Sequence, residues 1–217
     1  MCAPEAVCQS NAMSAEEPPT VSLRIDHDVF GANKPVREIF LDVLRNTGAR
    51  GGFAQFVGCT DLPKGHLDVK KGITVRDAMD ALVAANPGYQ WDMEDGVVNL
   101  MPRRGVPLLN TIITKFHMEA TDQEAHVFFQ DLLTVPEVQQ REAALGLKKG
   151  LGQGGPTSVP KHPVPKKHLP VSINVQNLTL QESFNKIVGV LPKGVWLYYE
   201  TDCNGAKTYI VDVASDY

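Results

Sequence analysis

The fold of this chain is decided by residues 67–102, which read LDVKKGITVRDAMDALVAANPGYQWDMEDGVVNLMP. A short alternating strand opens the stretch and an amphipathic helix follows it. The apolar side chains of that helix recur on one face, at Val75, Ala78, Met79 and Leu82. Pro87 ends the helix, because proline cannot continue its hydrogen-bond ladder. Two further strands follow, so the sequence predicts a small unit of mixed helix and strand.

A second stretch repeats this order. Residues 171–213 read VSINVQNLTLQESFNKIVGVLPKGVWLYYETDCNGAKTYIVDV. Moving 105 positions along the chain carries one set of residues onto another of similar kind: Thr74 to Thr179, Leu82 to Ile187, Pro87 to Pro192 and Trp91 to Trp196. A single shift that superposes a threonine, a proline and a tryptophan indicates an internal repeat. The chain is therefore predicted to contain two copies of one module.

Local signals fix the ends of the elements in each copy. Thr74 and Thr179 suit the N-caps of the two helices, and Asp77 and Glu182, three residues on, complete capping boxes. The sequences Asp-Gly and Asn-Gly favour tight hairpins. They predict strands that pair as 89–93 with 97–101, and as 195–200 with 208–213.

The segments before each copy also correspond. A strand at Val21–Ile25 and a helix at Pro35–Leu44 precede the first copy, and a strand at Ile112–Phe116 and a helix at Asp122–Leu133 precede the second. The predicted fold class is α+β. It consists of two tandem small modules, each with two helices packed on short β-sheets in the order βαββαββ.

These patterns divide the chain. Residues 1–18 read as a flexible leader, and Gln9–Ala12 within it resembles the remnant of a cleavable tag, so whether residues 1–12 are native stays open. The first module covers residues 19–104 and the second residues 107–217. The second carries an insertion that starts as a helix near 137–147 and continues as a Gly/Pro/Lys-rich stretch at 148–168.

Composition narrows the classes of function. The chain has 217 residues, 43% of them hydrophobic, which suits a globular protein with a sizeable core. Its 21 basic and 25 acidic residues give a net charge of −4, so the overall field does not attract nucleic acid. No apolar run reaches the length of a membrane-spanning helix, and the N-terminus lacks the pattern of a signal peptide.

With the order of elements established, the chain resembles the STN module, the short N-terminal domain of secretins and TonB-dependent outer-membrane proteins. The resemblance rests on Leu67–Val69, Thr74–Leu82, Tyr89–Trp91 and Val97–Leu100, together with their counterparts in the second copy. It covers nearly all of residues 20–217. It implies a bacterial periplasmic protein-interaction domain used in signalling or assembly. Because no plug, barrel or secretin core follows, transport or pore formation by this chain alone is not expected.

The four cysteines fall into two groups. Cys2 and Cys8 lie in the leader, and Cys59 and Cys203 lie one in each module. No pair has the spacing of a zinc or redox C-x-x-C motif. The simplest interpretation is two unpaired thiols in the folded part, whereas a Cys59–Cys203 bridge, or a Cys2–Cys8 loop, would imply an oxidising compartment.

No arrangement of residues predicts a catalytic site, a cofactor or a metal. Enzymatic activity would need two or more of a small set of side chains to converge in a pocket: Asp26, His27, Asp28, His66 and His117. Asp26-His27-Asp28 follows a predicted strand and suits a turn in which the aspartates bond the backbone. The sequence therefore predicts a protein that is not an enzyme.

Modules with short sheets present edge strands, and an edge strand can bind a partner's strand through main-chain hydrogen bonds. We expect a periplasmic or exported adaptor that binds an envelope protein through sheet edges and the insertion. The candidate partner-binding residues are Val195, Trp196, Leu197, Tyr198, Tyr199, Lys161, His162, Lys166 and Lys167. The alternative is a small-molecule or glycan binder that uses a cleft between the modules, with Trp91, Trp196 and Tyr199 as stacking surfaces.

Overall fold

The computed structural model describes residues 20–215, apart from 21, 60–61, 122–124, 151–169 and 192. The fold is α+β, as predicted. The elements of the first half are β1 (Val29–Pro35), α1 (Val36–Arg45), β2 (Arg50–Val57), β3 (Lys64–Val69), α2 (Val75–Ala85), β4 (Tyr89–Glu94) and β5 (Val97–Pro102). Those of the second half are β6 (Ile112–Thr121), α3 (Ala125–Leu132), α4 (Pro136–Leu145), β7 (Leu147–Lys149), β8 (Pro170–Thr179), α5 (Leu180–Gly189), β9 (Gly194–Cys203) and β10 (Ala206–Ser215).

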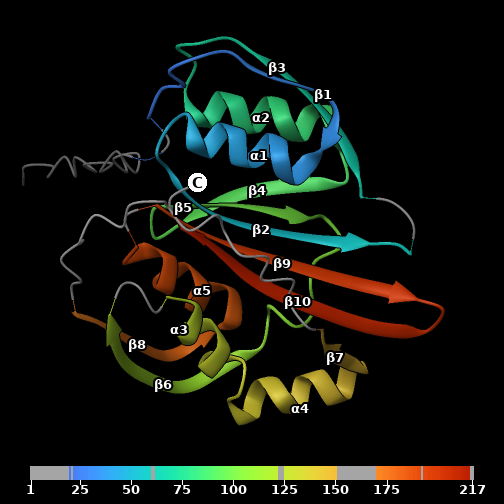
Figure 1. Cartoon of the computed structure of the whole chain (residues 1–217), viewed down its shortest axis with the longest axis vertical. Coiled ribbons are helices and arrows are strands. Elements are labelled where there is room, and N and C mark those ends of the chain that lie inside the picture. Colours follow the sequence, from blue (N-terminus) through green and yellow to red (C-terminus); the bar gives the residue numbers. More distant parts are fainter. Residues whose placement is uncertain are drawn as a thin grey trace, which may run out of the picture.

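The elements stack in five layers, which Figure 1 shows from top to bottom. The antiparallel pair β1–β3 covers α1 and α2, and these helices pack on a central sheet. Helices α3 and α5 lie on the opposite face of that sheet, and the antiparallel pair β6–β8 covers them. The two halves of the chain therefore share one sheet, with the helices of each half on its own side.

The central sheet has six strands in the order β4-β5-β2-β9-β10-β7. In the first half β5 is antiparallel to β4 and parallel to β2. In the second half β10 is antiparallel to β9 and parallel to β7. The same three-stranded unit thus occurs twice, and the units join where β2 runs parallel to β9.

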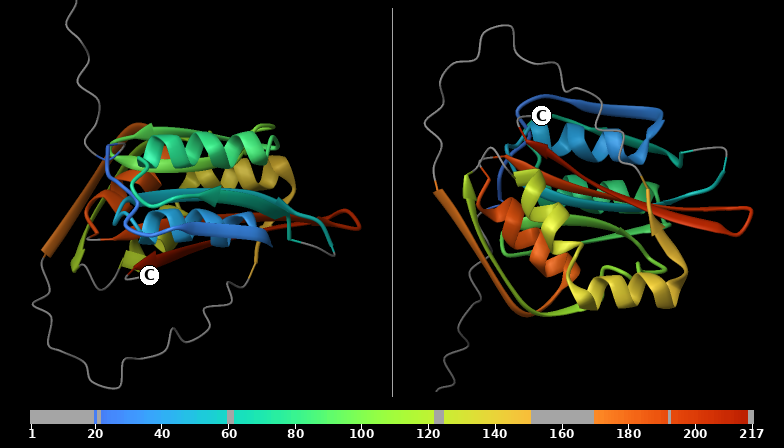
Figure 2. Two further views of the ribbon diagram at one scale, coloured as in Figure 1. Left: turned by 90° about the horizontal axis from the view of Figure 1, so that it is seen from above. Right: turned by 60° about the horizontal axis from the view of Figure 1, so that its bottom comes forward.

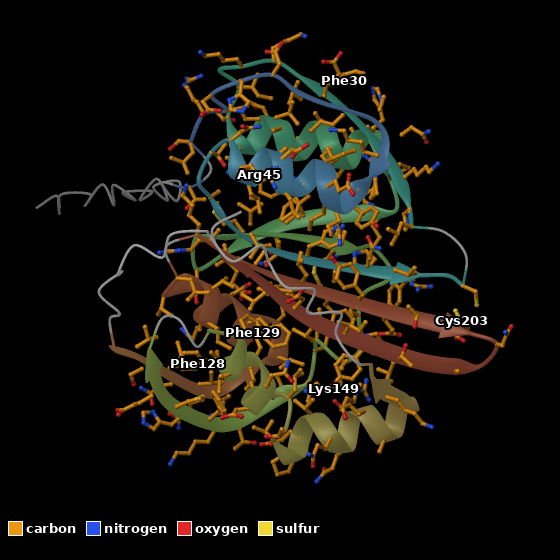
Figure 3. The ribbon with its side chains drawn as sticks, in the orientation of Figure 1. Phe30, Arg45, Phe128, Phe129, Lys149 and Cys203 are labelled. Carbon is orange, nitrogen blue, oxygen red and sulfur yellow. The ribbon has the colours of Figure 1, made fainter. Side chains whose placement is uncertain are left out.

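Alternation along the strands builds two hydrophobic cores from one sheet. Phe53 and Leu197 belong to the core beneath α1 and α2, and their neighbours Ala54 and Trp196 belong to the core beneath α3 and α5. Phe128 and Phe129, both buried, fix α3 to the second core (Figure 3). Each core contains side chains from both halves of the chain, so neither core is complete without the other half.

The local predictions of caps and hairpins are confirmed. Both capping boxes are present, one between Thr74 and Asp77 and one between Thr179 and Glu182. The β4–β5 hairpin closes through two residues of positive φ, Asp95 at 51° and Gly96 at 75°. The β9–β10 hairpin closes through Asn204 and Gly205 in the same way. It projects beyond the layers (Figure 2).

The predicted strand at Val21–Ile25 is wrong. Residues 22–25, the described part of this segment, form an isolated bridge between Arg24 and Thr74 and belong to no named strand, and the strand that pairs with β3 is β1. Ile25 is nevertheless buried, and its backbone bonds to Ile73 and Gly72. The alternation in the sequence marked a segment with one buried side chain, and such a pattern does not distinguish a strand from an extended loop.

The helical start of the insertion is confirmed, because α4 begins at the N1 proline Pro136 and ends at Gly146 in the left-handed conformation. Within the described part of the chain, no helix has both the length and the apolar character needed to cross a membrane.

Candidate functional site: an open sheet edge

The strand predicted to bind a partner is not at an edge. β9 pairs with β10 on one side and with β2 on the other, in register from Gly51 opposite Val195 to Val57 opposite Thr201. Four of the predicted contact residues are buried, namely Val195, Trp196, Leu197 and Tyr198. The fifth, Tyr199, is half-buried, and its hydroxyl accepts a hydrogen bond of 3.2 Å from the Arg37 guanidinium. The prediction of an open edge at residues 195–200 is therefore wrong.

The other predicted contact residues lie in the insertion. Lys161, His162, Lys166 and Lys167 fall outside the described residues, so their part in binding stays a prediction.

The six-stranded sheet ends at β4 on one side and at β7 on the other. β7 has only three residues, whereas β4 has six. In a hairpin closed by two residues, the residues on either side of the turn form a hydrogen-bonded pair, which here is Glu94 with Val97. Along β4, every second residue then directs its backbone N–H and C=O groups toward β5, and the residues between them direct these groups away. Trp91 and Met93 consequently direct their backbone N–H and C=O groups away from β5. We call this row of groups the β4 edge.

Trp91 lies on the β4 edge in a polar setting. Its Nε1 donates a hydrogen bond of 2.8 Å to the Asp80 carboxylate of α2. The Arg76 guanidinium lies 5.9 Å from the centroid of the indole ring. Trp91 is half-buried, whereas Asp80 and Arg76 are exposed. The indole is thus held by two charged side chains while part of its surface stays in contact with solvent.

The same arrangement occurs in the second half of the chain. Trp196 Nε1 donates to Asn185 Oδ1 of α5, also at 2.8 Å. The repeat places Asn185 at the position of Asp80. Here, however, the strand β2 lies against β9, and a Cβ atom at Gly52 would lie 2.2 Å from Trp196 Cε2. Trp196 and Asn185 are both fully buried. An added strand therefore covers this tryptophan, and its counterpart on β4 has no such cover among the described residues.

Carboxyl groups gather beside the β4 edge. Asp92, Glu94 and Glu182 border a hollow of about 340 Å³ between β4 and the start of α5. Partial burial, and then the neighbouring Glu182 charge, raise the pKa of Glu94, while Asn185 Nδ2 donates to its carboxylate at 2.9 Å. The Thr179 backbone N–H instead lowers the pKa of Glu182. A basic side chain entering this hollow would find three acidic neighbours.

The larger hollow lies where the two halves meet, and the predicted stacking surface is not there. Residues of both halves line a space of about 650 Å³, including Phe56, Arg104, Glu200 and Lys207. The Arg104 guanidinium lies 3.3 Å from the centroid of the Phe56 ring and covers it. The expectation that Trp91 and Trp196 face one cleft is wrong, because they lie on opposite faces of the sheet and Trp196 is buried.

The side chains considered for acid–base chemistry are dispersed. His27, Asp28 and Arg45 line one hollow, but the Asp28 carboxylate accepts the Lys71 backbone N–H at 2.9 Å. That bond, and then the Lys70 ammonium, lower the pKa of Asp28. His27 pairs with Asp26. The aspartates therefore serve the local backbone and ion pairs.

The other two histidines of the set considered for acid–base chemistry lie elsewhere. His66 is on β3, with its ring 6.5 Å from that of Phe30, and His117 is on β6, with Nδ1 2.7 Å from Asn174 Oδ1. Among the described residues, no group of three His, Cys, Asp or Glu side chains is arranged to hold a metal ion.

No family model, curated protein or solved structure matches this chain.

Proposed function

We propose that this chain is a protein-interaction module that binds an extended segment of a partner protein as a further strand on the β4 edge. The observation that carries the proposal is the contrast between the two tryptophans. Trp196 is covered by β2, which runs parallel to β9, whereas the equivalent Trp91 keeps a free strand edge beside it in the described part of the chain. Binding by strand addition needs few special side chains, which agrees with the dispersed polar groups described above.

The internal β2–β9 junction indicates what such a partner looks like. Its strand would run parallel to β4 and would place glycine, or another small residue, opposite Trp91, as Gly52 lies opposite Trp196. A lysine or arginine on the face toward α5 would reach Asp92, Glu94 and Glu182. These features define a class of partner segment, and the resemblance to STN modules supports a periplasmic or exported location for the encounter.

The first experiment uses a peptide copy of the covering strand. The peptide carries RGGFAQFV, the sequence of residues 50–57, between solubilising lysines, and is titrated into the isotopically labelled protein. We expect the amide resonances of Trp91 and Met93 to shift most, with a Kd on the order of 0.1 mM, because a short peptide loses conformational entropy on binding. A peptide with valine in place of the glycine opposite Trp91 should bind roughly tenfold more weakly.

The matched protein variant is Met93→Pro. Proline removes one outward N–H of the β4 edge while the ladder to β5 keeps its donors. We expect this variant to keep the fold, with little change in the midpoint of thermal unfolding, and to lose the peptide. Met93→Leu should bind as the wild type does. Equal binding by Met93→Pro, or an absence of shifts at Trp91 and Met93 at millimolar peptide, would refute the proposal.

The same pair of variants tests for a natural partner. An envelope protein recovered from extract by the wild type and by Met93→Leu, but not by Met93→Pro, would support the proposal. Recovery that depends instead on residues 148–168 would move the contact to the insertion.

A small-molecule binder remains the second candidate, at the 650 Å³ hollow between the halves. It has less support, because Arg104 already occupies the exposed face of Phe56 and the hollow combines basic and acidic side chains with little aromatic surface.

A further inference from the structure

Two cysteines from opposite halves of the chain meet at the end of the β2–β9 junction. The paired register of these strands runs as far as Val57 opposite Thr201. Cys59 lies two residues beyond the end of β2 and Cys203 is the last residue of β9, so continuing the same register would place the two cysteines opposite each other. Cys203 is labelled in Figure 3 near the tip of the projecting hairpin, where β2 also ends. Residues about 140 positions apart in the sequence are thus neighbours in space.

The geometry suits a covalent bond. Neighbouring strands lie about 4.8 Å apart, and the Cα atoms of bridged cysteines lie roughly 4.4 to 6.8 Å apart. The neighbouring Cys59 thiol, followed by burial, raises the pKa of Cys203. Cys59 Sγ also lies 3.8 Å from the Asp202 carbonyl oxygen, so the Cys59 side chain extends toward β9. Cys59 is exposed and Cys203 is half-buried, and both are free thiols in the structure.

We propose that Cys59 and Cys203 form a reversible disulfide that fastens β2 to β9 and so joins the two halves of the protein. The oxidant is a small disulfide such as oxidised glutathione. The exposed Cys59 thiolate attacks one glutathione sulfur, which forms a mixed disulfide and releases the first glutathione thiolate. Cys203, after losing its proton, then attacks the Cys59 sulfur and releases the second. Two electrons and two protons pass from the cysteines to glutathione, which leaves as two thiols.

The bond has a mechanical consequence for the fold. It closes a loop of roughly 140 residues, and long closed loops restrict the unfolded chain most. It also holds the strand that covers Trp196 at its far end, close to the hairpin that projects from the layers (Figure 2). In the oxidised protein, β2 and β9 could no longer separate at that end.

The experiment uses the full chain with Cys2→Ser and Cys8→Ser, so that only Cys59 and Cys203 remain. The protein is equilibrated with mixtures of reduced and oxidised glutathione, and the thiols are trapped and analysed by intact mass and peptide mapping. We expect loss of two hydrogen atoms, a cross-linked peptide that joins Cys59 to Cys203, and a rise of about 10 °C in the thermal midpoint.

Single variants report the two steps separately. Cys203→Ser should stop at a stable glutathione adduct on Cys59, because no second thiol is present to displace it. Cys59→Ser should react more slowly, because Cys203 is half-buried. The double variant should fold and should show the same thermal midpoint in both buffers.

Two outcomes would overturn the proposal. One is a protein that keeps both thiols, or accumulates mixed disulfides with glutathione, under strongly oxidising conditions. The other is an internal disulfide that lowers the thermal midpoint, which would mean that the bond forms only in a distorted junction. Neither outcome bears on strand addition at the β4 edge, which does not depend on these thiols.

Discussion

Trp91 and Trp196 occupy equivalent positions in the two halves of this protein but have different surroundings. Each indole donates to an oxygen on the helix beside it at 2.8 Å. The covered tryptophan uses the neutral amide of Asn185, and the half-exposed one uses the carboxylate of Asp80 with Arg76 nearby. Burial explains this difference, because moving a charged group from water into the protein interior raises its free energy, whereas a charged group at the surface stays hydrated. The repeated motif is therefore a tryptophan on a strand edge, which β2 covers in one half of the chain and which no strand covers among the described residues of the other half.

The largest effect is expected from Gly52→Val, which places a side chain between β2 and Trp196. The added Cβ would lie 2.2 Å from Trp196 Cε2 and 2.4 Å from Asn99 Oδ1, so the junction must open. We expect the free energy of unfolding to fall by more than about 3 kcal/mol, measured by urea denaturation. Gly58→Val is the matched control, since nothing lies within 4 Å of a Cβ there. Similar losses in both variants would show that the close approach of β2 does not matter.

This junction also marks the limit of what the sequence could predict. The capping boxes and both hairpins are local patterns, and they were predicted correctly because residues a few positions apart decide them. The pairing of β2 with β9 joins residues more than a hundred positions apart, and no periodicity reports it. One signal was present: adjacent glycines inside a strand, Gly51 and Gly52, often mark the close approach of another element.

The candidate site was misplaced for the same reason. If the second module is considered by itself, the aromatic strand at Val195–Glu200 has an unpaired edge. The repeat alone does not show which of the two equivalent strands is covered by another strand. The difference between Asp80 and Asn185 indicates which strand is covered, because the charged member of two equivalent residues is expected in the exposed position.

The second effect tests the exchange of charge between the two positions. Asn185→Asp removes the amide that donates to Glu94 and places a buried carboxylate beside it. We expect a loss of about 2 to 3 kcal/mol at neutral pH, smaller in acid, where the carboxyl groups are protonated. The reverse change, Asp80→Asn, should alter stability by less than about 0.5 kcal/mol, because the amide still accepts from Trp91 at an exposed site. If both changes cost the same, burial does not explain the choice of residue.

A smaller effect of opposite sign is expected at Gln55, on the covering strand. Gln55 is buried with 1% of its surface exposed, and neither polar atom of its side chain has a hydrogen-bond partner among the described residues. Gln55→Met keeps the length of the side chain and removes the unsatisfied amide, so we expect a gain of about 1 kcal/mol in urea denaturation. Gln90→Met, at an exposed position on β4, is the control and should leave stability nearly unchanged. A loss of stability in Gln55→Met would indicate that the amide binds an internal water molecule.

The smallest effect concerns Glu94, which lies on β4 but accepts its hydrogen bond from the other half of the chain. Burial, followed by the Glu182 charge, raises its pKa in the folded state, so the folded protein binds this proton more tightly than the unfolded chain does. Binding of this proton therefore stabilises the folded state. The stabilisation is fully present below the ordinary pKa of a glutamate in the unfolded chain, and it is lost as the pH rises through the higher pKa of Glu94 in the folded protein. Glu94→Gln keeps an oxygen for Asn185 and removes the titration. We therefore expect the variant to be more stable than the wild type at pH 7, by less than about 1 kcal/mol because the group is largely solvated, and the two to converge toward pH 4. Thermal unfolding from pH 4 to pH 8 measures this difference. If the difference in stability between the variant and the wild type does not change with pH, the ionisation of Glu94 does not cause it. If the difference grows toward acid pH, the pKa of Glu94 is lowered in the folded state and not raised.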